Sequence, residues 1–196
     1  KGFVRILGKL ASMRDAGIEI EFFIGNHDMW MFKYFEEELG IPIHREPIQV
    51  DLQGKRFFLG HGDGLGPGDQ KYKLIKSIFA NRLLQKLYGS IHPNWGLRIM
   101  RKFSSKSREY NSVEELSFLG PQREWLVQFC ENKSNDCEID YFVFGHRHLP
   151  IDYALSNGTS RYINLGDWLT HYSYGKYENG NLELFFFEND NGKIYP

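Results

Sequence analysis

Three apolar segments of this chain each end in a glycine that is followed at once by side chains able to bind a metal. The loops are Gly25-Asn26-His27-Asp28, Gly60-His61-Gly62-Asp63 and Gly145-His146-Arg147-His148. Glycine lets the backbone turn sharply where a strand ends. The carboxyl ends of strands are where α/β proteins place ligand-binding groups. We therefore expect the three loops to meet at one edge of a sheet.

The loops offer imidazole nitrogens together with amide and carboxylate oxygens, and they contain no cysteine. Such a mixed donor set suits Mn, Fe, Zn or Ni, and it differs from the thiolate set of a closed structural zinc site. A single Gly-His pair is usually a turn beside a packed histidine. Three such loops in succession predict a metal centre. The chain has two cysteines, Cys130 and Cys137, which are too few for a disulfide framework and favour a reducing cytosol.

The pattern along the 196 residues predicts one α/β domain with a mixed sheet, because helices alternate with strands early and strands follow strands late. No run of about 18 apolar residues predicts a membrane-spanning helix. Helices are expected over Phe3–Asp15, Met29–Leu39 and Gln122–Glu131, and strands over Ile18–Ile24, Ile48–Leu52, Arg56–Leu59, Ile139–Phe144, Tyr153–Leu155, Arg161–Leu165, Tyr172–Tyr177 and Leu182–Glu188. Gln53-Gly54 predicts a hairpin between two of these strands.

A strongly basic segment lies in the middle of the chain. Lys71–Arg108 holds ten Lys and Arg and no Asp or Glu, although the whole chain has a net charge of −1. Ile75, Phe79, Leu83 and Leu87 recur every fourth residue and predict one amphipathic helix. This surface could meet an anionic partner, including an anionic membrane surface, or could simply be a solvated, packed lid.

The order of the three loops resembles that of the calcineurin-like metallophosphoesterases, over about Ile18 to Leu165. The resemblance implies a sandwich of two mixed β-sheets flanked by helices, with two divalent metals at the strand ends. Mn is the expected metal, with Fe, Zn or Ni as alternatives. His27 would face the scissile phosphate, and Asp28 would orient a histidine. The metal ligands implied by the resemblance are Asn26, His61, His146 and His148.

Two earlier motifs of the family, Asp-x-His and Gly-Asp-x-x-Asp, do not occur before Gly25. Within the family they supply the carboxylate that bridges the two metals. Because the chain starts at Lys1 and not at a methionine, we expect these motifs upstream. The 196-residue chain alone is then expected to bind at most one metal well and to hydrolyse poorly.

Within that family, the details are similar to the Bacteroidetes-like form of the branch that acts in lipid A biosynthesis. That branch hydrolyses the pyrophosphate of UDP-2,3-diacylglucosamine to UMP and 2,3-diacylglucosamine 1-phosphate. The resemblance implies a single domain over residues 1–196 with a helical lid insertion over residues 65–117. It implies substrate contacts at Asp69, Ser107 and Asn111. It also implies a UDP-linked diacyl sugar lipid as partner, no nucleic acid, and a cytoplasmic enzyme held peripherally on the inner face of the inner membrane.

Two other functions compete with this hypothesis. A nucleotide or nucleic-acid phosphodiesterase of the same superfamily could use the basic segment to follow a phosphate backbone. The apolar stripe of that segment is largely aliphatic, however, whereas single-strand binders stack bases on aromatic rings. A non-catalytic scaffold with the same fold is the third hypothesis. The presence of Asp-x-His and Gly-Asp-x-x-Asp upstream would favour the enzyme over this scaffold.

Overall fold

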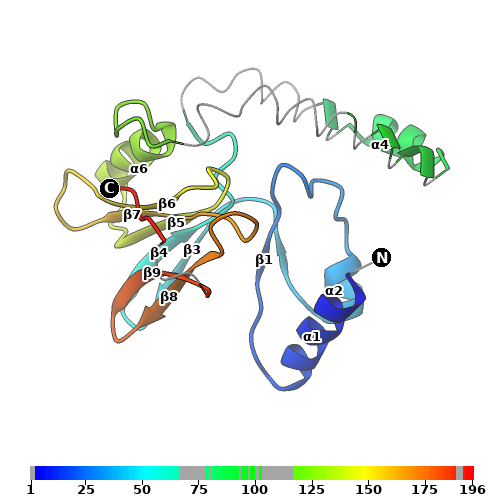
Figure 1. Cartoon of the computed structure of the whole chain (residues 1–196), viewed down its shortest axis with the longest axis horizontal. Coiled ribbons are helices and arrows are strands. Elements are labelled where there is room, and N and C mark those ends of the chain that lie inside the picture. The colour runs from blue at the N-terminus through cyan, green and yellow to red at the C-terminus, as the bar shows by residue number, and fades with distance from the viewer. Residues whose placement is uncertain are drawn as a thin grey trace.

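A five-stranded mixed sheet lies in the left part of the molecule in the view of Figure 1. The computed structural model describes residues 3–66, 78–79, 81–92, 94–96, 98–99, 102, 117–188 and 192–196. Strands β4, β5 and β7 run parallel, and β3 and β6 are antiparallel edges. This arrangement confirms the predicted α/β class with a mixed sheet. In the order β3-β4-β5-β7-β6, the strands span Ile48–Leu52, Lys55–Leu59, Tyr141–Phe144, Arg161–Leu165 and Pro150–Ala154.

Alternate residues of the central strands face two different layers, as the period of two along a strand requires. Phe58, Phe142 and Tyr162 pack in one cluster with Leu126 and Cys130 of helix α6. Helix α6 spans Trp125–Asp136 and covers that face of the sheet.

The other face of the sheet is covered by a hairpin of two strands, β8 (Ser173–Glu178) and β9 (Asn181–Phe186). Leu182 and Leu184 of β9 pack against residues from three central strands, namely Phe57, Tyr141 and Ile163. The sheet is therefore buried on both sides, which fits the consecutive apolar residues Phe57–Leu59 and Tyr141–Phe144 of two of its parallel strands.

A substitution at Phe142 tests the assignment of the core, because this side chain is fully buried at the middle of the sheet. We expect Phe142→Ala to lower the free energy of unfolding by about 3–5 kcal/mol, the usual cost of removing a buried aromatic ring. Urea denaturation measures this loss. Phe3→Ala is the control, because that ring is 72% exposed and its loss should cost no more than about 0.5 kcal/mol. Equal losses in both variants would contradict the assignment of the core.

The N-terminal part forms a small unit of helices α1 (Val4–Asp15) and α2 (Tyr34–Leu39) and strands β1 (Phe22–Phe23) and β2 (Ile43–His44), with β1 and β2 paired in parallel. The helix over residues 3–15 is confirmed. The strand expected over Ile18–Ile24 is shorter, because β1 pairs with two residues of β2.

The helix expected over Met29–Leu39 is confirmed only in its last six residues. The guanidinium of Arg45 donates to the main-chain carbonyls of Met31 and Phe32, at 2.9 Å each. Those carbonyl oxygens are thereby bonded to a side chain and not to a helical N–H. Gly40 ends α2 in the left-handed conformation, with φ 61°.

The hairpin expected at Gln53-Gly54 is confirmed, and both residues have positive φ, as a tight two-residue turn requires. The helix expected at Gln122 begins three residues later, at Trp125. The remaining strands lie within two or three residues of their expected ends.

The single helix expected through Phe79, Leu83 and Leu87 is wrong, because the chain is extended at Asn81 with ψ 116°. The Asn81 side chain accepts hydrogen bonds from the amides of Leu83 and Leu84, so it caps a new helix, α4 (Arg82–Gly89). Ile75 lies outside the described residues, as do residues 67–77 and 103–116 of the expected lid, whose bounds stay a prediction. No helix in the described ranges is long and apolar enough to cross a membrane.

Candidate metal centre

Two of the three glycine loops lie side by side because the strands that precede them are parallel neighbours. The Gly60 amide donates to the carbonyl of Val143 at 3.2 Å, which continues the pairing of β4 with β5. The Gly145 amide then donates to the carbonyl of His61 at 3.0 Å. As a result, the rings of His61 and His146 meet edge to face, with centroids 5.2 Å apart.

The third loop follows β1 and reaches the same place. The Asn26 amide oxygen lies 3.1 Å from Nε2 of His61. Glycine at position 25 permits this approach, since a Cβ atom there would lie 2.8 Å from Cε1 of the His61 ring. Asn26, His61 and His146 are therefore the predicted residues that the structure brings into direct proximity.

His27, Asp28 and His148 are exposed residues of the same loops. His27 and His148 lower the pKa of His61, whereas the Asp28 carboxylate opposes them. All three thus lie near enough to interact electrostatically with the central imidazole. The predicted substrate contacts Asp69, Ser107 and Asn111 lie outside the described residues.

Burial is the main influence on both central imidazoles. It lowers the pKa of His61, partly against the attraction of Asp63 and Asp28. Burial, together with the neighbouring His61, lowers the pKa of His146 to about 4. Both rings are consequently neutral at pH 7, and a neutral imidazole is the form that binds a metal.

The donor chemistry fits a divalent ion such as Mn²⁺ or Zn²⁺, since it combines neutral imidazole nitrogens with an amide oxygen. Within the described part of the chain, no three His, Cys, Asp or Glu side chains are grouped so as to hold a metal ion. The group that the structure assembles is two imidazoles and one amide.

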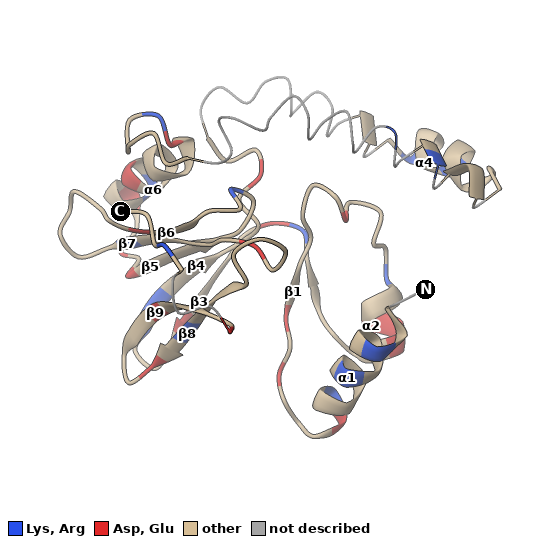
Figure 2. Cartoon of the chain, viewed as in Figure 1, with Lys and Arg blue, Asp and Glu red and all other residues tan. Residues whose placement is uncertain are grey.

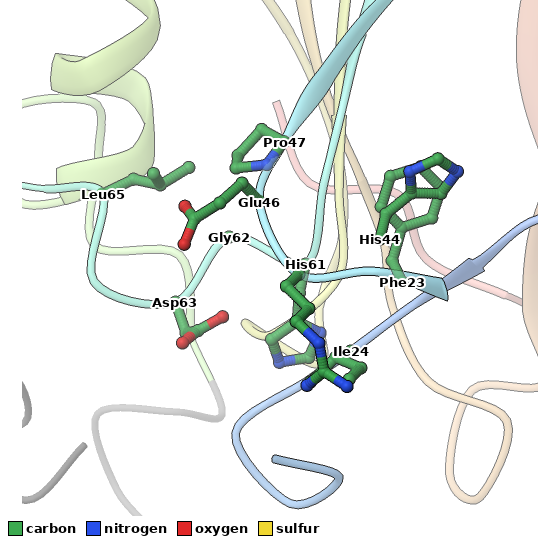
Figure 3. Close-up of a pocket in the computed structure, with 10 residues that line it drawn as sticks. Phe23, Ile24, His44, Glu46, Pro47, His61, Gly62, Asp63 and Leu65 are labelled. Atoms are coloured by element: carbon green, nitrogen blue, oxygen red, sulfur yellow. The ribbon is translucent and has the colours of Figure 1, made fainter. Parts of the chain in front are cut away.

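A shallow pocket runs beside His61 and is lined by residues of β1, β2 and the loop after β4 (Figure 3). Asp63 and Glu46 bring carboxylates to this pocket. A Cβ at Gly62 would lie 3.3 Å from both Leu126 and Phe144, so the loop passes tightly over the core at this point.

Three residues around the loop after β5 were not singled out from the sequence. The Trp125 ring lies 5.6 Å from the His146 ring. The Asn164 side-chain amide donates to the carbonyl of Gly145, and Glu124 pairs with Arg147. Asn164 alone carried a signal, since it is a polar residue inside an apolar strand.

No family model matches the chain. The chain is similar to the UDP-2,3-diacylglucosamine hydrolase of Porphyromonas gingivalis, with 37% identity over 94% of the chain and 74% of the relative. It is also similar to the UDP-2,3-diacylglucosamine hydrolases of Serratia proteamaculans, at 29% identity, and of Yersinia enterocolitica, at 27%; each match covers 93% of the chain and 75% of the relative. Taken with the mixed sheet and the order of the three glycine loops, these likenesses show that the chain belongs to the UDP-2,3-diacylglucosamine hydrolase family.

Proposed function

We propose that this chain is a hydrolase that cleaves the pyrophosphate of UDP-2,3-diacylglucosamine, giving UMP and 2,3-diacylglucosamine 1-phosphate for lipid A biosynthesis. The observation that carries the proposal is the 37% identity, over 94% of the chain, to a relative of that name. The convergence of Asn26, His61 and His146 at one sheet edge supports a hydrolytic centre over a scaffold without metals.

The metal centre of this proposal uses Asn26, His61 and His146 for one divalent ion and His148 for a second. Mn²⁺ is the proposed metal, and the neutral imidazoles and the Asn26 amide oxygen support it. Bound divalent ions would supply Lewis-acid polarisation of the phosphoryl oxygens.

Other residues of the same loops would act on the substrate directly. His27 is exposed at the edge of the centre, where it would donate a hydrogen bond or a proton to the scissile phosphate. Asp28 would orient a histidine, and its electrostatic effect on His61 supports this role. Asp69, Ser107 and Asn111 remain proposed substrate contacts.

Helix α4 is the proposed site for the acyl chains and for contact with the inner face of the inner membrane in the cytoplasm. Its Leu83, Leu84 and Leu87 side chains are 66%, 43% and 58% exposed. Arg82 and Lys86 lie on the same helix, which shows basic and no acidic residues (Figure 2). Exposed leucines beside basic residues support both an acyl-chain surface and an anionic membrane surface.

The acyl-chain role predicts a selective effect of Leu83→Asp and of Leu87→Asp. Burying a leucine side chain against a lipid is worth about 1.5–3 kcal/mol, so each variant is expected to raise KM for the diacylated substrate by roughly 10–100-fold. Cleavage of bis-p-nitrophenyl phosphate, which has no acyl chain, should change little. Leu52→Asp is the matched control, because Leu52 is 41% exposed on β3. Equal losses with both substrates would contradict the role.

The function itself is tested with the protein produced from its complete reading frame. We expect UMP release from UDP-2,3-diacylglucosamine in the presence of Mn²⁺, loss of that activity with a chelator, and recovery when Mn²⁺ is restored. Cleavage of single-stranded oligonucleotides without UMP release would favour the nucleic-acid phosphodiesterase. Inactivity toward every phosphoester, with no metal bound, would favour the scaffold.

A further inference from the structure

A buried ion pair lies behind the loop that carries His146 and His148. Arg147, between the two histidines, has its side chain only 12% exposed, and the Glu124 side chain is 2% exposed. Arg147 Nε donates to Glu124 Oε2 at 2.8 Å, and Arg147 Nη2 donates to the carbonyl of Ser117 at 3.3 Å. Because burying two charges has a large desolvation cost, such a pair is weak evidence of a stabilising role.

The backbone beside this pair is strained. His146 and His148 have φ of 63° and 56°, in the left-handed region that non-glycine residues seldom occupy. Strained residues persist only where their surroundings hold them in place. Arg147 joins the two strained positions, and its amide donates to the carbonyl of Gly145 at 2.7 Å.

The start of helix α6 contacts this loop twice. Glu124 is the residue before the helix and binds the Arg147 guanidinium. The next residue, Trp125, places its ring 5.6 Å from the His146 ring. The Glu124 Oε1 atom is buried without a hydrogen-bond partner in the described part of the structure. The hydrogen bond that the described structure gives to the Glu124 carboxylate comes from Arg147.

We propose that Glu124 and Arg147 are positioning residues for the metal centre. The ion pair fixes the loop after β5 in its left-handed conformation and so holds the His146 imidazole against His61. Without the pair, the backbone can relax to ordinary φ values, and both histidines of the loop move. This inference rests on the proposed function, since it concerns the same metal ligands.

The test compares Mn²⁺ affinity, measured by titration followed with electron paramagnetic resonance, with the midpoint of thermal unfolding of the metal-free protein. Glu124→Gln and Arg147→Met are each expected to lower the unfolding midpoint and to weaken Mn²⁺ binding roughly 10–100-fold, the usual effect of losing a partner behind a ligand. The double variant Glu124→Leu/Arg147→Met fills the site with apolar groups. It should regain thermal stability while its Mn²⁺ binding stays weak.

The matched control is the pair Arg161–Asp152, which joins β7 to β6 through Arg161 Nε and Asp152 Oδ1 at 3.0 Å. The double variant Asp152→Leu/Arg161→Met should keep normal Mn²⁺ affinity. Recovery of both stability and Mn²⁺ affinity in the Glu124→Leu/Arg147→Met protein would overturn the positioning role, as would unchanged affinity in the single variants. Failure of the unsubstituted protein to bind Mn²⁺ would overturn the proposed function, and this inference with it.

Discussion

Replacing His61 with alanine is expected to reduce UMP release from UDP-2,3-diacylglucosamine by roughly three orders of magnitude. The imidazole lies between the other two assembled donors, 3.1 Å from the Asn26 oxygen and with its centroid 5.2 Å from that of His146. Removing it would weaken the hold on a divalent ion that supplies several kcal/mol of transition-state stabilisation, and about 1.4 kcal/mol is a factor of ten in rate. Steady-state kinetics at the lowest Mn²⁺ concentration that saturates the unsubstituted protein measure the loss.

The control for this substitution is His171→Ala, because His171 lies in the turn after β7 and is assigned no role in the reaction. It should retain nearly all of the activity. The thermal unfolding midpoint of the metal-free His61→Ala protein should stay within a few degrees of normal. An active His61→Ala enzyme would contradict the proposed centre.

Gly25→Ala is expected to lower the rate by roughly 100-fold while leaving the fold intact. The new Cβ atom would lie 2.8 Å from Cε1 and 2.9 Å from Nε2 of His61, closer than real Cβ contacts come. The imidazole must then move, and a displacement near 1 Å in a catalytic arrangement can cost about 100-fold. The rate is measured as UMP release, and circular dichroism reports the fold.

The matched control is Gly8→Ala in helix α1, where a Cβ would meet nothing within 4 Å. Alanine should slightly stabilise that helix and leave the rate unchanged. A normal rate in Gly25→Ala would mean that the Asn26 loop stands farther from His61 during turnover than it does in this structure.

The sheet edge could be predicted from sequence because its signals are local. Phe57, Phe58 and Leu59 form an apolar strand that stops at Gly60, and Tyr141–Phe144 does the same at Gly145. The parallel order of two such strands then follows from the α/β pattern. The proximity of Asn26 to His61 agrees with the expected meeting of the loops.

The features that could not be predicted depend on contacts between residues that are distant in the sequence. In one of them a side chain takes main-chain carbonyls that a helix would otherwise use. Arg45 bonds the carbonyls of Met31 and Phe32, and no local pattern around those residues indicates it. The Glu124–Arg147 pair joins residues 23 positions apart, and nothing in the sequence around Glu124 marks it as the partner of the Gly145–His148 loop. The helix break at Asn81 did have a local signal, because asparagine is among the preferred N-cap residues. The apolar repeat at every fourth residue favoured one continuous helix instead.

The pairing of β4 with β5 has a kinetic consequence. Lys55 and Asp140, which bond at the beginning of this ladder, are 85 positions apart in the chain, and the whole basic segment lies between them. The entropy lost in closing so long a loop must be overcome before the β4–β5 contacts can form. Topologies rich in such long-range contacts fold slowly. The two central imidazoles come from the far ends of these same strands. Refolding should therefore bring His61 and His146 together only in the slow step, so catalytic activity should return no faster than the long-range ladder forms.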